Sequence, residues 1–173
     1  MSESAKHREA VRQYCTGNGV DLGCADDAIV PHAIRVDLPP EKFKNYNAQR
    51  TGDGIHWRGD ATDLPFKDGT LDFVHSSHLL EDFALSDWAR VLREWSRVLK
   101  IGGHLIIAVP DHVRFRYRVE HRGQGDNLAH KHMAHVGELS EWFATWKIIM
   151  DRFVNDDATE YSIIFVAQKL PPS

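Results

Sequence analysis

The sequence predicts an α/β fold of three layers, built on a mostly parallel seven-stranded sheet with an antiparallel C-terminal hairpin. Three observations predict this fold class. Short apolar runs that end in glycine, aspartate or serine alternate with segments of helical periodicity. The run at 105–109 is wholly apolar, which is typical of strands buried on both faces of a parallel sheet. Two final apolar runs flank a polar Asn-Asp-Asp turn, which is typical of a hairpin.

The composition fits one globular domain. The chain has 173 residues, a net charge of −4 and 42% apolar residues, and it shows no internal repeat or linker. The longest apolar run, 105–110, is far shorter than the roughly 20 residues of a membrane helix, and no apolar signal segment follows the start. Two cysteines are too few for a disulfide scaffold. We therefore expect a cytoplasmic protein without a membrane span, and the slightly acidic chain argues against nucleic-acid binding.

The first half of the chain begins with a predicted N-terminal helix in residues 1–18, which the glycines of Gly17-Asn18-Gly19 end. Strands are expected at 20–23, 33–38 and 54–58, with a weak helix at 41–50. The connection after Gly23 is short and contains Pro31. The first crossover helix is therefore predicted to be missing or much shortened.

The second half contains the clearest helix of the sequence. Large apolar residues recur at helical spacing from Trp88 to Leu99, with Ser86 as the expected N-cap and Gly102-Gly103 as the expected stop. The other expected elements are strands at 71–77 and 105–109, a short helix at 140–145, and hairpin strands at 146–154 and 161–169 around a turn at 155–157.

Polar residues stand where the predicted parallel strands end. The turn at 21–26 follows the first strand, Asp37 ends the second, Asp60 follows the third, and 76–78 follow the fourth. Ligands of open parallel sheets bind at these carboxyl ends. Each aspartate alone is an ordinary turn former. Together and in this order they predict a nucleoside site, in which Asp37 accepts hydrogen bonds from ribose hydroxyls and Asp60 meets an adenine amino group.

Five segments resemble the successive motifs of class I S-adenosylmethionine-dependent methyltransferases, in particular the small methyltransferase type 11 domains. They are VDLGCA at 20–25, RVDL at 35–38, GDATDLPF at 59–66, LDFVHSSHLLE at 71–81 and LREWSRVLKIGG at 92–103. The resemblance covers about residues 19–110. It implies a Rossmann-like fold, with residues 1–173 as one methyltransferase-like domain, and S-adenosyl-L-methionine as the cofactor.

The resemblance also implies which residues contact the cofactor. The methionine end would be lined by Asp21, Gly23, Cys24, Ala25, Ser76 and Ser77, with His78 near the transferring methyl group; the adenosine end would be lined by Asp37, Leu38, Asp60, Ala61 and Leu64. Two departures from the family pattern stand out. Ala25 occupies the place of a second glycine, and Asp37 follows Gly23 by 14 positions, against roughly 20 where a whole helix intervenes.

Residues 111–137 form a His- and Arg-rich insert, which we expect on the substrate side. The segment His130-Lys131-His132-Met133-Ala134-His135 is open to three interpretations: a metal site, a contact with the acceptor, or a solvated loop. Because H-x-H-x-x-H alone is a weak pattern, we assign no metal ligand. Arginines at alternate positions from 114 to 118, on an extended or irregular segment, could clamp an acceptor phosphate or carboxylate, or form a solvated edge.

The predicted reaction is methyl transfer to an O or N nucleophile of a small-molecule or glycan-type acceptor. The first candidate base is His78, followed by His132 or His130, with Asp111 as a further candidate. Few residues are available to cap the acceptor site, so the insert, or the second subunit of a homodimer, would complete it. The alternative is a catalytically inactive methyltransferase-like domain that binds the cofactor or a protein partner.

Overall fold

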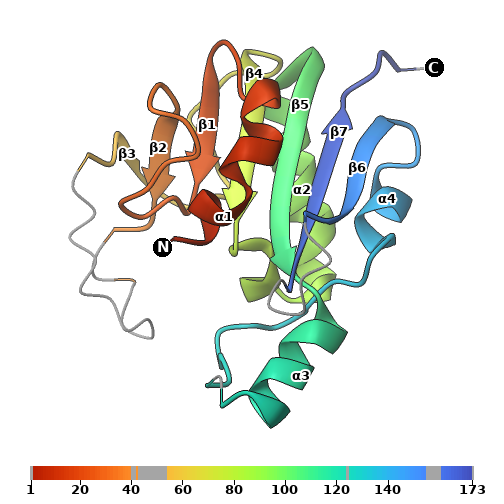
Figure 1. The fold of residues 1–173 in the computed structure, drawn as a ribbon. Coiled ribbons are helices and arrows are strands. Elements are labelled where there is room, and N and C mark those ends of the chain that lie inside the picture. Colours follow the sequence, from red (N-terminus) through yellow and green to blue (C-terminus); the bar gives the residue numbers. More distant parts are fainter. Residues whose placement is uncertain (1, 40–41, 43–53, 124, 155–160, 173) are drawn as a thin grey trace.

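The computed structural model describes residues 2–39, 42, 54–123, 125–154 and 161–172 (Figure 1). Seven strands form one sheet: β1 (Gly19–Leu22), β2 (Ile34–Asp37), β3 (Trp57–Arg58), β4 (Leu71–Ser77), β5 (Leu99–Pro110), β6 (Lys147–Phe153) and β7 (Ser162–Gln168). Their order is β3-β2-β1-β4-β5-β7-β6. The first five strands run parallel, and β7 pairs antiparallel with both β5 and β6. The predicted fold class is confirmed.

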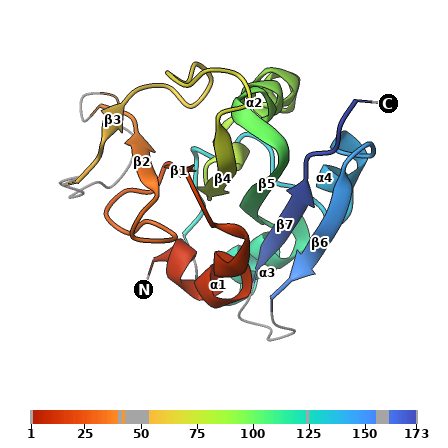
Figure 2. The same ribbon diagram turned by 90° about the horizontal axis from the view of Figure 1, so that it is seen from above.

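Helices cover both faces of the sheet, which gives three layers (Figure 2). They are α1 (Glu3–Val11), α2 (Leu85–Val98), α3 (His112–His121) and α4 (Glu138–Trp142), with short 3-10 turns η1 (Arg12–Tyr14) and η3 (Leu80–Asp82). Helix α1 lies on one face, and α2 and α4 lie on the other. Within the described ranges no helix is long and apolar enough to cross a membrane.

The loop between β1 and β2 contains no helix, as the sequence predicts. Residues 23–33 are fully described and form only turns and bends. Helix α1 covers this part of the sheet instead, since Val11 packs with Ile29, Val30 and Phe73 in one buried cluster. Arg8 of α1 donates hydrogen bonds to the carbonyl oxygens of Ala28 and Ile29. The N-terminal helix thus takes over the packing role of the missing crossover helix.

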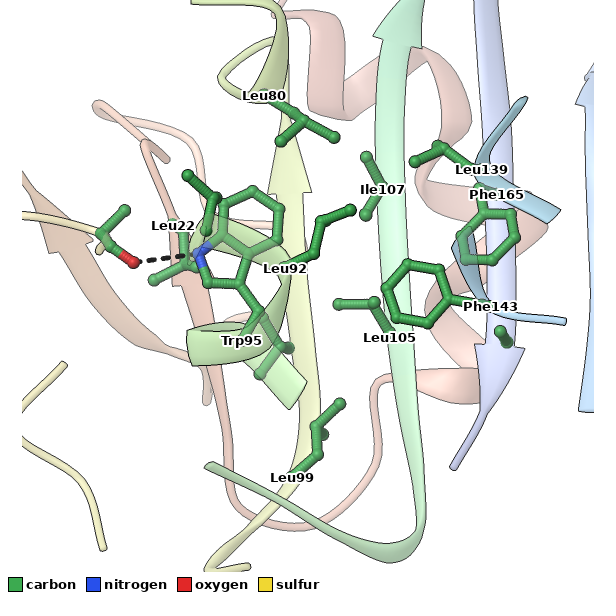
Figure 3. Close-up of a cluster of buried hydrophobic side chains, with 14 of the residues drawn as sticks. Leu22, Leu80, Leu92, Trp95, Leu99, Leu105, Ile107, Leu139, Phe143 and Phe165 are labelled. Atoms are coloured by element: carbon green, nitrogen blue, oxygen red, sulfur yellow. Dashed lines mark hydrogen bonds between the residues drawn. The ribbon is translucent and has the colours of Figure 1, made fainter. Parts of the chain in front are cut away.

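Helix α2 supplies the core of the opposite face (Figure 3). Trp88, Val91, Leu92, Trp95 and Val98 are buried at helical spacing, so one apolar stripe meets the sheet. The indole Nε1 of Trp95 donates to the carbonyl oxygen of Ala61 at 3.0 Å (Figure 3). This bond joins α2 to the segment that follows β3.

Both predicted ends of α2 were wrong. The N-cap is Ala84, whose extended backbone precedes the helix, and Ser86 lies inside the first turn. The helix ends at Val98 and the chain enters β5 directly, so Gly102 and Gly103 lie within that strand rather than stopping the helix. A Cβ at Gly103 would stand 3.0 Å from the carbonyl oxygen of Asp72. Close strand approach, not helix termination, therefore requires this glycine.

The insert is more regular than expected. Residues 112–121 form α3, capped by the Asp111 carboxylate, which accepts from the backbone N–H of Arg114 at 2.9 Å. The prediction of an extended or irregular arginine segment was therefore wrong. The helical periodicity was hidden because only Phe115 is buried in α3. The strand expected at 54–58 is limited to β3, while most of the helix expected at 41–50 and the turn at 155–157 lie outside the described residues.

Replacing Trp95 with Phe is expected to lower the free energy of unfolding by about 1–2 kcal/mol, because the substitution removes a buried hydrogen bond and part of a packed ring. Urea unfolding followed by circular dichroism measures the change. Trp142→Phe is the matched control, since this side chain is 42% exposed, and it should change stability by less than about 0.5 kcal/mol. Equal effects of the two substitutions would contradict the assigned role of Trp95.

Candidate active site

A cavity of about 610 Å³ lies at the carboxyl ends of β1, β2 and β4. Its walls come from segments far apart in the sequence: the N-terminal end of α1, the turn after β1, the end of β2, the residues after β4, the insert, and Tyr161 before β7. Figure 1 shows α3 beyond the end of the sheet at which β5 finishes. The parallel topology thus gathers these residues at one edge, as ligand sites in such sheets require.

Most of the cofactor residues expected from the sequence line this cavity. Those in its wall are Gly23, Cys24, Ala25, Asp37, Leu38, Ala61, Ser77 and His78. Four others lie outside it. Asp21 and Ser76 are fully buried, Leu64 is buried behind the wall, and Asp60 is exposed and accepts hydrogen bonds from Thr62. For all twelve residues, direct contact with a cofactor remains a prediction.

Asp37 organises the turn that faces it. Its Oδ2 accepts a hydrogen bond from the backbone N–H of Ala25 at 2.9 Å, and its Oδ1 accepts from the N–H of Leu38 at 2.8 Å. The side chain is almost buried but still reaches the cavity. It therefore fixes the position of the turn after β1 and forms part of the cavity wall beside it.

Two residues of the cavity wall adopt left-handed backbone conformations that side chains disfavour. Ala25 has φ 48° and His78 has φ 53°. A side chain with a Cβ is strained in this region, and such strain gathers at functional sites. A glycine at position 25, as the family pattern has it, would adopt this conformation without strain. Ala25 keeps the same left-handed backbone in spite of its Cβ.

Behind the turn, Asp21 begins a buried chain of hydrogen bonds. Its Oδ2 accepts from the backbone N–H of Ile29 at 2.6 Å, and its Oδ1 accepts from Nδ1 of His75 at 2.6 Å. His75 Nε2 lies 3.1 Å from Nε2 of His7 in α1. Because His75 donates through Nδ1, its Nε2 accepts from His7 when both rings are neutral. Burial, reinforced by the neighbouring His75 and His78, lowers the pKa of His7 to about 2.

His78 stands at the centre of a polar cluster. Its Nε2 lies 2.9 Å from Ser162 Oγ and 3.5 Å from Glu3 Oε2, and its Nδ1 lies 3.3 Å from Glu81 Oε1. Burial acts to lower the pKa of His78, but the adjacent Glu81 carboxylate, together with Glu3, raises it above the ordinary value. The cavity therefore contains an imidazole that holds its proton more tightly than usual.

The other candidate bases occupy different places. His130 lines the cavity and also a second hollow of about 300 Å³, and burial lowers its pKa. His132 faces only the second hollow, bonded through Nε2 to Glu138 Oε1 at 2.7 Å. Asp111 caps α3 and is not in the cavity wall. Among the described residues, no group of three or more His, Cys, Asp or Glu side chains is arranged to hold a metal ion.

The arginines of the insert are engaged with aromatic rings and carboxylates. The guanidinium of Arg114 lies 3.4 Å from the ring centroid of Phe153, that of Arg118 lies 4.9 Å from Tyr161, and Arg116 pairs with Asp126 at 3.1 Å. None of the three lines the cavity.

Sequence reasoning missed Glu3, Phe115 and Tyr161, which line the cavity. Glu3 lies in α1, Phe115 lies in α3, and Tyr161 directly precedes β7. None of them belongs to a sequence motif that would have predicted a place in the site.

Comparisons of the sequence with known proteins point to the methyltransferase family. The family model described as "Methyltransferase domain" matches residues 9–107. Ajmaline N-methyltransferase of Rauvolfia serpentina is 29% identical over an alignment of 103 residues. The match covers 52% of this chain and 35% of that protein. The chain spans about a third of the length of the curated relatives it matches.

Solved structures share the fold. A SAM-dependent methyltransferase of Thermotoga maritima, described as a possible histamine N-methyltransferase, has a TM-score of 0.69 at 19% identity and covers 96% of this chain and 89% of its own. The 1,6-didemethyltoxoflavin-N1-methyltransferase of Burkholderia thailandensis, solved with 1,6-didemethyltoxoflavin and S-adenosylhomocysteine bound, has a TM-score of 0.67 at 14% identity and covers 98% of this chain and 79% of its own.

Replacing Ala25 with Gly is expected to raise the free energy of unfolding by about 0.5–1 kcal/mol, because glycine adopts the left-handed conformation without a Cβ clash. Thermal and urea unfolding measure the change. Ala61→Gly is the control, since Ala61 also lines the cavity but has no positive φ, and it should destabilise by about 0.4–1 kcal/mol. Destabilisation by both substitutions would show that the turn is not strained.

The neutral His7 makes stability sensitive to acid. The unfolded chain takes up a proton on His7 below about pH 6.5, whereas the folded chain does so only near pH 2, so the free energy of unfolding should fall as the pH drops. This residue contributes a slope of about 1.4 kcal/mol per pH unit. His7→Gln should flatten the decline between pH 6 and pH 4.5 in urea titrations, while His121→Gln, at an exposed position, should not. Parallel declines in all three proteins would refute this.

Proposed function

This chain belongs to the methyltransferase domain family, and we propose that it transfers the methyl group of S-adenosyl-L-methionine to a nitrogen nucleophile of a small-molecule acceptor. The observation that carries the proposal is the single cavity into which Asp37, the turn at 23–25, Ser77 and His78 all project. Its volume of about 610 Å³ lies in the range of small-molecule sites.

The cavity wall fits the cofactor in two respects. Ser77 Oγ is buried and has no hydrogen-bond partner within the described part of the chain, so a ligand that reaches it would satisfy an otherwise unmet polar atom. Asp37 keeps its turn within reach of the same space, where its carboxylate can accept hydrogen bonds from ribose hydroxyls. We assign the adenosine end to Asp37, Leu38 and Ala61, and the methionine end to the turn at 23–25 and Ser77.

In the proposed reaction the protein has two tasks: it places the acceptor next to the cofactor, and it removes a proton from the acceptor. The bound cofactor supplies an electrophilic methyl group on a sulfonium. The protein holds the acceptor nitrogen in line with it and excludes water, which lowers the entropic part of the barrier. An acceptor that arrives as an ammonium must first lose a proton. His130 can take up this proton, because it faces the cavity and burial, which lowers its pKa, favours the neutral ring that can accept one.

Nitrogen is preferred to oxygen as the acceptor atom on two grounds. One curated relative with 29% identity, ajmaline N-methyltransferase, acts on nitrogen by its name, as does the Burkholderia protein of like fold. An amine also needs only a weak base, whereas a hydroxyl needs a stronger one. A hydroxyl of a small molecule or glycan is the second candidate acceptor, and an inactive domain that binds the cofactor or a protein partner is the alternative for the whole chain.

Calorimetric titration with S-adenosylhomocysteine should show binding at micromolar affinity, and Asp37→Asn should weaken it at least about tenfold because a charged acceptor is lost. Asp63→Asn, an exposed carboxylate near β3, is the matched control and should bind like the unaltered chain.

The second arm of the same experiment supplies methyl-labelled S-adenosylmethionine with a panel of small amines, matched alcohols and nucleotide sugars. Label on amines alone supports the proposal. Label only on hydroxyl compounds refutes the choice of nitrogen, binding without transfer to any acceptor favours the inactive domain, and absence of binding refutes the cofactor site.

A further inference from the structure

Glu81 is a buried carboxylate that no motif role explains. It lies in η3, just beyond β4, with 1% of its side chain exposed. Within the described part of the chain, neither carboxylate oxygen accepts a well-aligned hydrogen bond. Its Oε1 lies 3.3 Å from His78 Nδ1 and 3.7 Å from His130 Nε2. A buried carboxylate is costly unless a positive charge balances it, and among the described residues the basic groups at this range are the two imidazoles.

The backbone of Glu81 brings the second imidazole to the cavity. Its carbonyl oxygen accepts from the N–H groups of Lys131, at 2.6 Å, and His132, at 3.1 Å. These two bonds fasten the insert to η3 immediately after His130. The side chain and the main chain of one residue therefore set the positions of both histidines that line the cavity.

The two histidines have unequal surroundings. His78 faces Glu81, Glu3 and Ser162, with the Tyr161 ring edge-on at 5.6 Å; the Lys6 ammonium acts against its protonation, and the neighbouring His7 is neutral. His130 packs against the ring of Phe115, at 5.0 Å between centroids, and its Nδ1 is buried without a partner in the described residues. Environments that differ in this way separate an acid from a base at neutral pH.

We propose that Glu81 is a positioning residue for methyl transfer: its carboxylate holds the His78 ring as an imidazolium and leaves the neutral His130 free to accept the proton of an ammonium acceptor. The proposal rests on the proposed function. In the step, the acceptor gives its proton to His130 and becomes an amine. The amine lone pair then forms the N–C bond while the C–S bond breaks, and its electron pair stays on sulfur. Glu81, in contact with both rings, balances the charge that His130 gains.

The test is nuclear magnetic resonance titration of histidine-labelled protein, with the His78 and His130 signals assigned from His78→Gln and His130→Gln. In the unaltered chain His78 should titrate above 6.5, and Glu81→Gln should lower this value by at least one unit, a tenfold change in acid dissociation. Glu3→Gln, which removes the more exposed carboxylate at 3.5 Å, should lower it less. Binding of S-adenosylhomocysteine by Glu81→Gln should stay within threefold of the unaltered chain, because the Glu81 side chain is not in the cavity wall.

An unchanged His78 titration in Glu81→Gln, or a change no larger than in Glu3→Gln, overturns the proposal. If Glu81→Gln does not fold, Glu81→Asp decides, because its shorter side chain withdraws the carboxylate and should lower the His78 value by an intermediate amount. The titration needs neither cofactor nor acceptor. If the unaltered chain does not bind S-adenosylhomocysteine, the proposed function is refuted. If it binds but the His78 titration is unchanged in Glu81→Gln, only the role of Glu81 is refuted.

Discussion

The carboxylate of Asp21 joins the sheet, the loop after β1 and the N-terminal helix at one buried point. A loop that replaces a crossover helix has lost the internal hydrogen bonds of that helix, and its backbone groups need other partners. Asp21 accepts from the N–H of Ile29, and Arg8 donates to the carbonyl oxygens of Ala28 and Ile29. The chain through His75 to His7 then fixes α1 against the same loop. The cavity wall depends on this anchorage, since α1 delivers Ser2 and Glu3 to it.

Each of the two strained residues of the cavity wall is in contact with a carboxylate. Asp37 accepts a hydrogen bond from the N–H of Ala25, and Glu81 contacts the ring of His78, which leaves its backbone in the left-handed region. Strained conformations persist only where their surroundings over-determine them. In each case a buried or nearly buried negative charge supplies that constraint, so geometry and electrostatics of the site have the same source.

Much of the fold could be predicted from the sequence, because the strands β1, β2 and β4 carry periodic apolar residues and end in polar ones. Seven of the eleven other expected cofactor residues line the cavity because they lie at or just past the strand ends, namely Gly23, Cys24, Ala25, Asp37, Leu38, Ala61 and Ser77. Asp21 does not, since it pairs in register with His75 within the sheet and points toward α1. Helix α3 was missed because it has almost no apolar stripe, and Glu3 and Tyr161 because only the tertiary structure brings them to the site.

Carboxylates and histidines at the cavity suit the proposed reaction, which needs no oxyanion hole. Transfer from a sulfonium to a neutral amine moves a positive charge from sulfur to nitrogen and creates no negative charge to stabilise. A fixed negative charge beside the path interacts favourably with the positive charge throughout, and it does so strongly where water is excluded. Glu3 lines the cavity, and the fully buried Glu81 lies behind it, in contact with His78 and His130. Cationic Arg114 and Arg118, by contrast, are held on the rings of Phe153 and Tyr161, outside the cavity wall, so the insert contributes His130 to the cavity while these two guanidinium groups stay out of its wall.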